Sequence, residues 1–300
     1  MSAEQLPDAP LAGLRILFLH GIGAPAPNSF ERRVHLETLR AAGATVLCPN
    51  LHTSKTKWRE KHSVVRHLMR QPLLWALTAL ATVVPLAAAY QFNSAAHGGA
   101  SVAIFLGSFM AMPKIKKRLL RGALDSALGA TRAAARDALK AAWDGGGVDV
   151  CVGYSWGGAL AVVLAAEDEW AWRGPTLLVA PAVDKLLKPS PRWRAAADLR
   201  RCGAHAASRV RVLQGANDGI VAAKGVVRWA TEHKLGVKTL PAARHELGRT
   251  EEERKELVDA VAALAKAARG ASEKEREGWL GPGARKVAGE RARAALADAM

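Results

Sequence analysis

The sequence has few aromatic residues and few cysteines, and both shortages exclude classes of function. Aromatic side chains make up 5% of the 300 residues, too few to form a base-stacking platform. The three cysteines, Cys48, Cys151 and Cys202, are odd in number and far apart, with no CxxC pair for metal or redox chemistry. We therefore expect a reducing compartment and neither a metal nor a cofactor.

Acidic residues are also scarce relative to basic ones. Asp and Glu number 27 against 43 Lys and Arg, which gives a formal net charge of +16 and makes anionic surfaces plausible neighbours. The basic residues are scattered and no recognition motif accompanies them, so we expect no nucleic acid partner. The first 14 residues lack a basic segment followed by an apolar run, which predicts a cytoplasmic protein without a signal peptide.

Short apolar runs alternate with helical patterns along most of the chain. This alternation predicts a doubly wound, mostly parallel α/β sheet with right-handed crossovers. The expected strands are residues 15–19, 44–48, 148–152, 176–180, 209–214 and 237–240. The expected helices are residues 28–42, 114–143, a stretch after Gly157, 193–201, 222–233 and 250–268.

An apolar insertion interrupts this alternation. We predict an N-terminal segment at 1–13, an α/β domain at 14–269 interrupted by a hydrophobic insertion at 52–113, and a charged tail at 270–300. Within the insertion, residues 72–92 are long enough to span a bilayer core of about 30 Å, a shorter apolar run follows at 100–112, and basic residues flank both runs. Residues 72–112 therefore predict either a membrane hairpin with both ends in the cytoplasm or a soluble lid.

The five residues Gly153 to Gly157 form a G-x-S-x-G motif with Ser155 at its centre. An apolar strand precedes the motif and a helical stretch follows it, which is the context that a nucleophilic serine on a sharp strand-to-helix turn requires. Gly153 and Gly157 leave room for that turn. The start of the following helix directs free N–H groups at the reacting centre, so the Trp156 N–H is one expected oxyanion donor.

At these residues the chain resembles the α/β-hydrolase superfamily, over most of residues 14–268. The run Leu17 to Gly23 is similar to the His-Gly turn of that family, which implies a structural role for Gly21 and makes the Ile22 N–H the second oxyanion donor. The resemblance implies a shaping role for His20 and not that of a base. The chain has no lid in the position that is usual for the superfamily, since only about thirty residues separate Ala180 from Val210.

Two further segments resemble the family and supply partners for the serine. Leu213 to Val221 is similar to its G-x-x-D-x-x-V segment, which makes Asp218 the triad acid. Arg244 to Leu247 follows the last expected strand, where the family carries its histidine, which makes His245 the base. The chain order Ser155, Asp218, His245 is the order of that family.

These residues predict a serine hydrolase that cleaves an ester or thioester of a small acyl substrate, such as a lipid, through an acyl-enzyme. Two alternatives remain open. The same triad could transfer the acyl group to an acceptor other than water, or the chain could be a non-catalytic, membrane-associated interaction protein on a hydrolase scaffold.

Overall fold

The computed structural model describes residues 9–23, 31–54, 59, 61–77, 79, 83, 87, 113–144, 147–166, 172–188, 190, 192–194, 198–199, 208–272, 275–276 and 278–279. The chain divides into two compact units, residues 1–53 with 130–300 (the α/β unit) and residues 54–129 (the small unit). Helix α5, Pro113–Asp144, begins in the small unit and ends in the α/β unit.

Six of the described strands of the α/β unit form one sheet in the order β2-β1-β5-β6-β7-β8, and every neighbouring pair is parallel. The predicted parallel α/β sheet is therefore confirmed. Because all strands run in one direction, their carboxyl ends meet at one edge and their amino ends at the other. The strands are β1 Arg15–Leu19, β2 Thr45–Leu47, β5 Val150–Tyr154, β6 Thr176–Val179, β7 Val210–Gly215 and β8 Gly236–Leu240.

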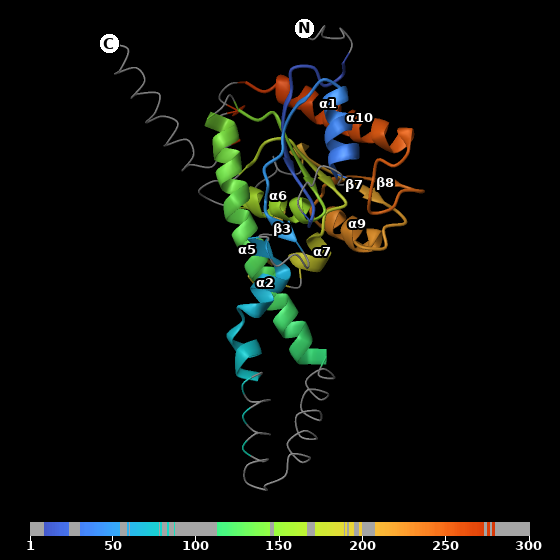
Figure 1. Ribbon diagram of the computed structural model, residues 1–300. Helices are drawn as coiled ribbons and strands as arrows, with labels where there is room; N and C mark the ends of the chain where they lie inside the picture. Colours follow the sequence, from blue (N-terminus) through green and yellow to red (C-terminus); the bar gives the residue numbers. More distant parts are fainter. Residues whose placement is uncertain are drawn as a thin grey trace, which may run out of the picture. The chain divides into compact units, whose positions relative to one another are not determined.

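One face of the sheet packs against the helices α1, Glu37–Ala41, and α10, Glu251–Arg269, which lie side by side (Figure 1). Leu257, Val261 and Leu264 bury one face of α10 against the alternate side chains of the central strands. Thr250 caps the helix by accepting a hydrogen bond from the Glu253 N–H at 3.1 Å. A six-residue π-helix, Glu31–Leu36, leads into α1.

The opposite face is covered by α6, Trp156–Ala166, and α9, Ala223–Glu232 (Figure 1). Helix α6 is apolar on all sides, which is typical of a helix buried between a sheet and further helices. The amphipathic helix α9 buries Val226, Trp229 and Ala230. A short helix that was not predicted, α7, Val183–Leu186, follows β6.

Much of the predicted insertion lies outside the described residues, as do residues 280–300 of the predicted tail and most of the helix expected at 193–201. Of the apolar runs expected to form a hairpin or lid, the structure describes residues 72–77, which are helical, and residues 79, 83 and 87, while the rest lie outside the described residues. Among the residues that are described, no helix is both long enough and apolar enough to cross a membrane.

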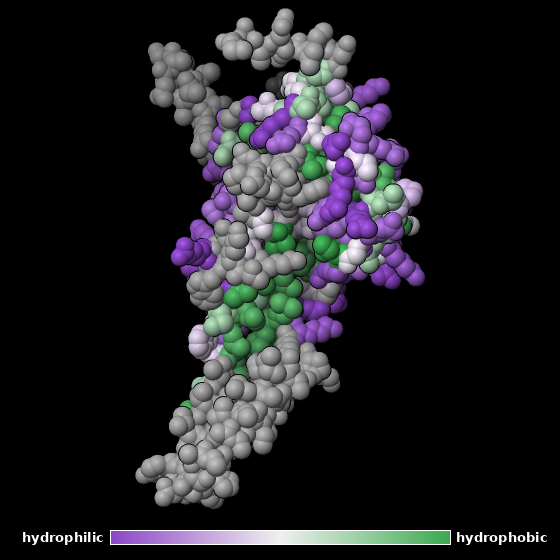
Figure 2. Space-filling model, turned by 45° about the vertical axis from the view of Figure 1, so that its right-hand side comes forward, coloured by the Kyte–Doolittle hydropathy of each residue, from purple (hydrophilic) through white to green (hydrophobic). Residues whose placement is uncertain are grey.

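The small unit contains α2, Val64–Met69, and the first part of α5. Strand β4, His62–Ser63, pairs with β3, Thr53–Ser54, at the boundary of the unit. The His67 ring and the Ser126 hydroxyl, 2.9 Å apart, join α2 to α5. Figure 2 shows hydrophobic residues gathered over α2 and the neighbouring part of α5. Exposed large apolar side chains in this unit include Leu73, Trp75, Val83 and Leu120.

Candidate active site

Ser155 lies on a sharp turn between β5 and α6. Its φ of 53° is in the left-handed region, which costs a non-glycine residue about 1–2 kcal/mol. Three backbone hydrogen bonds hold this conformation. The Ser155 N–H donates to the Val179 carbonyl at 2.9 Å, and the Ser155 carbonyl accepts from Ala182 at 3.0 Å and from Ala159 at 3.2 Å.

The turn is possible only because small residues surround it. A Cβ on Gly153 would lie 2.6 Å from the Gly157 carbonyl oxygen, and one on Gly157 would overlap the carbonyl of Leu19 on the adjacent strand β1. A Cβ on Gly158 would lie 2.8 Å from the Pro181 side chain. The glycines of the motif are thus required by the close approach of α6 to the sheet.

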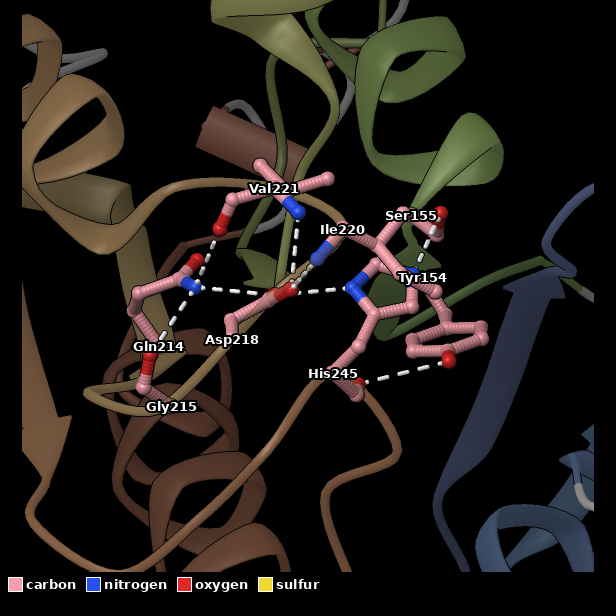
Figure 3. Close-up of polar contacts among 8 residues, drawn as sticks. All are labelled: Tyr154, Ser155, Gln214, Gly215, Asp218, Ile220, Val221 and His245. Atoms are coloured by element: carbon pink, nitrogen blue, oxygen red, sulfur yellow. Dashed lines mark hydrogen bonds and ion pairs between the residues drawn. The ribbon is translucent and has the colours of Figure 1, made fainter.

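His245 faces Ser155 from the segment between β8 and α10 (Figure 3). The His245 Nε2 atom is 3.0 Å from the Ser155 Oγ, and the His245 Nδ1 atom is 2.8 Å from the Asp218 Oδ2. Because a carboxylate can only accept, Nδ1 carries the proton and donates to Asp218, which leaves Nε2 free to accept from the Ser155 hydroxyl. The three residues singled out in the sequence therefore meet in one hydrogen-bonded chain.

Asp218 lies in the loop after β7, with its carboxylate fully buried. Its Oδ1 accepts from the Ile220 N–H at 2.8 Å and from the Val221 N–H at 2.7 Å. Burial by itself would raise the pKa of this carboxyl, but the hydrogen bonds from His245 and from the two amides outweigh it, so the pKa of Asp218 lies below its ordinary value. Asp218 is therefore held as an anion that faces His245.

Gln214 supports this carboxylate and was not singled out in the sequence. Its Nε2 donates to the Asp218 Oδ2 at 3.0 Å and contacts the carbonyls of Gly215 and Val221 at 3.2 Å each (Figure 3). The side chain is fully buried at the carboxyl end of β7. Gln214 thus binds the carboxylate oxygen that also faces His245, while the backbone donors bind the other oxygen. The sequence signal for it was a polar residue at the end of an expected strand, four positions before the predicted acid.

The segment that carries His245 is tied to the core by two side chains from distant parts of the chain. Tyr154 directly precedes Ser155 in the chain, and its hydroxyl donates to the His245 carbonyl at 3.3 Å. The His35 Nε2 lies 2.5 Å from the Leu247 carbonyl, which requires Nε2 to carry the proton and donate. The His35 and Tyr154 rings meet edge to face, 4.8 Å apart, and the Tyr154 ring lies 5.4 Å from that of His245.

His35 is buried beneath this segment and is held neutral. Burial lowers the pKa of His35 to about 4, assisted by the nearby His245 and opposed by the hydrogen bond to Leu247. A neutral His35 adds no positive charge beside His245. Its position, 212 residues before Leu247, explains why no local sequence pattern indicated its contact with the site.

Of the two expected oxyanion donors, Trp156 directly follows Ser155, and Ile22 lies in the turn after β1. Trp156 is the first residue of α6, so its N–H is one of the amides without a partner inside the helix. Its indole Nε1 donates to the Thr131 Oγ1 at 3.0 Å and anchors the start of α6 to α5. Ile22 follows the carboxyl end of β1, which is the neighbour of β5 in the sheet.

His20 and Gly21 shape the turn after β1. His20 is buried and donates from Nδ1 to the Gly21 carbonyl at 2.7 Å, while its Nε2 accepts from the Leu51 N–H at 2.9 Å. The Gly21 carbonyl also accepts from the Thr53 hydroxyl at 3.2 Å. Because both ring nitrogens form hydrogen bonds, His20 stabilises the turn and does not act as a base.

Neither metal ligands nor a reactive thiol adjoin the site within the described residues. No group of three or more His, Cys, Asp or Glu side chains in that part of the chain could hold a metal ion. Cys151 lies in β5, four residues before Ser155, and burial raises the pKa of its thiol to about 12, so it stays protonated.

No protein-family model and no curated protein matches this sequence. Among solved structures, the chain is similar to TT1662 from Thermus thermophilus, with 14% identity over 87% of this chain and 91% of that one and a TM-score of 0.48. It is similar to Est1E from Butyrivibrio proteoclasticus, with 11% identity over 89% and 92% of the two chains and a TM-score of 0.42. It is also similar to MGS-M1, an alpha/beta hydrolase enzyme from a Medee basin deep-sea metagenome library, with 12% identity over 89% of each chain and a TM-score of 0.41.

The chain's own strand order and serine turn define its fold. Its parallel sheet places β5 beside β1, with a serine at positive φ between β5 and α6. An acid follows β7 and a histidine follows β8; the histidine ring lies 3.0 Å from the serine hydroxyl, and the acid lies 2.8 Å from the histidine. This arrangement of sheet, nucleophile turn and chain order gives the protein an α/β-hydrolase fold.

Proposed function

We propose that this protein is a serine hydrolase that cleaves an ester or thioester of a small acyl substrate through an acyl-enzyme. One observation carries the proposal: Ser155, His245 and Asp218 form a continuous chain of polar contacts of 3.0 and 2.8 Å. These lengths suit a nucleophile that passes its proton to a base and a base that is oriented by an acid.

In the first step, the Ser155 Oγ attacks the carbonyl carbon of the substrate while the His245 Nε2 takes the hydroxyl proton. The imidazolium that forms is stabilised by Asp218, whose lowered pKa keeps it ionised. The Trp156 and Ile22 N–H groups would receive the negative charge on the substrate oxygen. His245 then gives its proton to the leaving alcohol or thiol, and the acyl group remains on Ser155.

In the second step, water takes the place of the leaving group. His245 removes a proton from the water, the resulting hydroxide attacks the acyl carbon, and the proton returns to Ser155 as the carboxylic acid leaves. Ser155, His245, Asp218 and a water molecule are thus sufficient for the chemistry of both steps.

Two rival functions use the same residues differently. An acyltransferase would replace water by another acceptor in the second step, and a non-catalytic protein would not use the triad at all. The second rival is disfavoured because Ser155 is kept in a costly backbone conformation and Asp218 is buried as an anion, which a purely structural protein has no reason to retain.

The test is hydrolysis of a series of p-nitrophenyl acyl esters by the full-length wild-type chain and two variants. Ser155→Ala removes the proposed nucleophile, and the matched control Ser208→Ala changes a serine just before β7, at the amino ends of the strands. We expect Ser155→Ala to lower kcat/KM by at least about 10³-fold and Ser208→Ala to leave it within about twofold. A pre-steady-state burst of p-nitrophenol would report the acyl-enzyme. Equal activity of wild type and Ser155→Ala would overturn the proposal, and ester products formed from added alcohols would favour the transferase.

A further inference from the structure

A cavity of about 250 Å³ lies in the α/β unit at the amino ends of the strands, away from Ser155. Thr176 and Val210, the first residues of β6 and β7, line it, together with the last turns of α6 and residues near 173 and 278. Ala165 in its wall comes nine residues after Trp156, about 13 Å further along the α6 axis. The cavity is therefore separate from the proposed active site.

Aliphatic and aromatic side chains form much of the described wall of this cavity. Leu178 and Leu199 contribute buried aliphatic side chains, and Trp172 contributes a buried indole. The hydroxyl of Thr176 is already used on both sides, because it accepts from the Trp172 Nε1 at 3.0 Å and donates to the Gly174 carbonyl at 3.0 Å. Such walls favour an apolar occupant over ordered water.

The lining also includes charged groups, and positive charge is in excess. Arg173, Arg209 and Glu275 line the cavity. The Arg209 guanidinium lies over the Trp279 ring, and its Nη2 is 3.9 Å from the Glu275 Oε1, while the Glu275 Oε2 accepts from the Ser272 N–H at 2.8 Å. Within the described part of the chain, no carboxylate pairs with the exposed guanidinium of Arg173. Among the described lining residues, two guanidinium groups therefore accompany one carboxylate, which favours an anionic ligand.

We propose that this cavity binds a small amphipathic anion, with its apolar chain against Leu178, Leu199 and Trp172 and its carboxylate on Arg173. Arginine presents parallel N–H donors that match a carboxylate, and the exposed position of Arg173 lets the ligand head stay partly hydrated. Arg209, already near Glu275, adds positive charge on the same side. The proposal concerns binding alone and does not depend on the chemistry at Ser155.

The probe is octanoate, titrated by calorimetry at neutral pH into the full-length Ser155→Ala protein, with octanamide as its uncharged counterpart. Octanoate should bind about tenfold more tightly than octanamide, because a charge-assisted hydrogen bond is lost with the amide. Arg173→Gln should weaken octanoate binding about tenfold and leave octanamide unchanged. The matched control Arg211→Gln, two residues beyond Arg209 on β7 and outside the cavity lining, should change neither by more than about twofold.

A second variant tests the location. Ala165→Phe places a ring in the cavity and should reduce the affinity for both ligands more than tenfold, with folding checked by circular dichroism and thermal unfolding. If this variant does not fold, the charge reversal Arg173→Glu replaces it and should abolish octanoate binding. Equal affinity for octanoate and octanamide, or octanoate binding that survives substitution of Arg173, would overturn the proposal. Neither result bears on whether Ser155 is a nucleophile.

Discussion

The carboxyl ends and the amino ends of the sheet's strands carry different kinds of side chains. At the carboxyl edge, Ser155, His245, Asp218 and Gln214 form one connected set of buried polar side chains. At the amino edge, apolar side chains line a cavity whose charged members among the described residues are Arg173, Arg209 and Glu275. The same strands therefore support a buried polar site at their carboxyl ends and a largely apolar cavity at their amino ends.

The difference follows from the direction of the strands. In a parallel sheet, the loops that follow β5, β7 and β8 converge at one edge, so residues far apart in sequence can form a single polar network there. Because the members of that network are buried, loss of one hydrogen bond leaves a buried polar group without a partner, which is costly. At the amino edge, the described polar contacts are fewer, namely the Trp172–Thr176–Gly174 hydrogen bonds and the Arg209–Glu275 ion pair, and they lie among apolar side chains.

The largest effect should come from breaking the acid at the carboxyl edge. In Asp218→Asn, the oxygen would remain with the Ile220 and Val221 amides, and the new NH₂ would face the His245 Nδ1. His245 would then carry its proton on Nε2 and could not accept from Ser155, so ester kcat/KM should fall by about 10⁴-fold. The neighbouring control Asn217→Ala should stay within about threefold. A loss below tenfold in Asp218→Asn would contradict this account.

The serine turn itself should tolerate no added methyl group. In Gly157→Ala, the new Cβ would overlap the backbone carbonyl of Leu19, which cannot move without disturbing β1. Urea unfolding should show a loss of at least about 3 kcal/mol, or no folded protein. Gly219→Ala is the matched control, because nothing lies within 4 Å of its added Cβ. Equal stability of the two variants would refute the close approach of α6 to β1.

The neutral His35 should make stability depend on pH. Its pKa of about 4 in the folded chain is below 6.5, so unfolding takes up a proton between these values and the free energy of unfolding falls as the pH drops. The loss should be about 3 kcal/mol over this interval. His35→Gln keeps a donor for Leu247 but cannot titrate, so urea unfolding across the interval should show a shallower pH dependence. Parallel curves for both proteins would show that His35 is not buried as a neutral ring.

The smallest effect should come from Tyr154→Phe, which removes only the hydroxyl that donates to the His245 carbonyl at 3.3 Å. We expect a loss of about 1 kcal/mol in the free energy of unfolding and a decrease in ester kcat/KM of less than about fivefold. Urea titration and steady-state kinetics measure the two changes. A decrease of 100-fold in activity at full stability would mean that Tyr154 takes part in the chemistry and does not merely position His245.

The sequence was sufficient to predict the sheet and the meeting of the three site residues. Apolar runs of four to six residues between helical stretches marked all six strands of the sheet, and the motif Gly153 to Gly157 marked the serine turn. Asp218 and His245 were predicted from the resemblance of their segments to those of the α/β-hydrolase superfamily, and each follows a predicted strand.

The supporting residues could not be predicted in the same way. Gln214, Tyr154 and His35 act through contacts with residues that lie four, 91 and 212 positions away along the chain. Local periodicity encodes which face of an element is buried, but it does not encode which distant polar group that face will meet. The cavity was missed for the same reason, because Arg173 and Glu275 come together only in the folded chain.

Covalent labelling of the folded chain with a fluorophosphonate, followed by intact mass measurement and peptide mapping, tests directly whether Ser155 is the nucleophile. We expect one phosphonyl group per chain, on Ser155, with no labelling of Ser155→Ala and much slower labelling of His245→Gln, since the base no longer activates the hydroxyl. Absence of a label on the folded wild-type protein, or a label that persists in Ser155→Ala, would contradict this assignment.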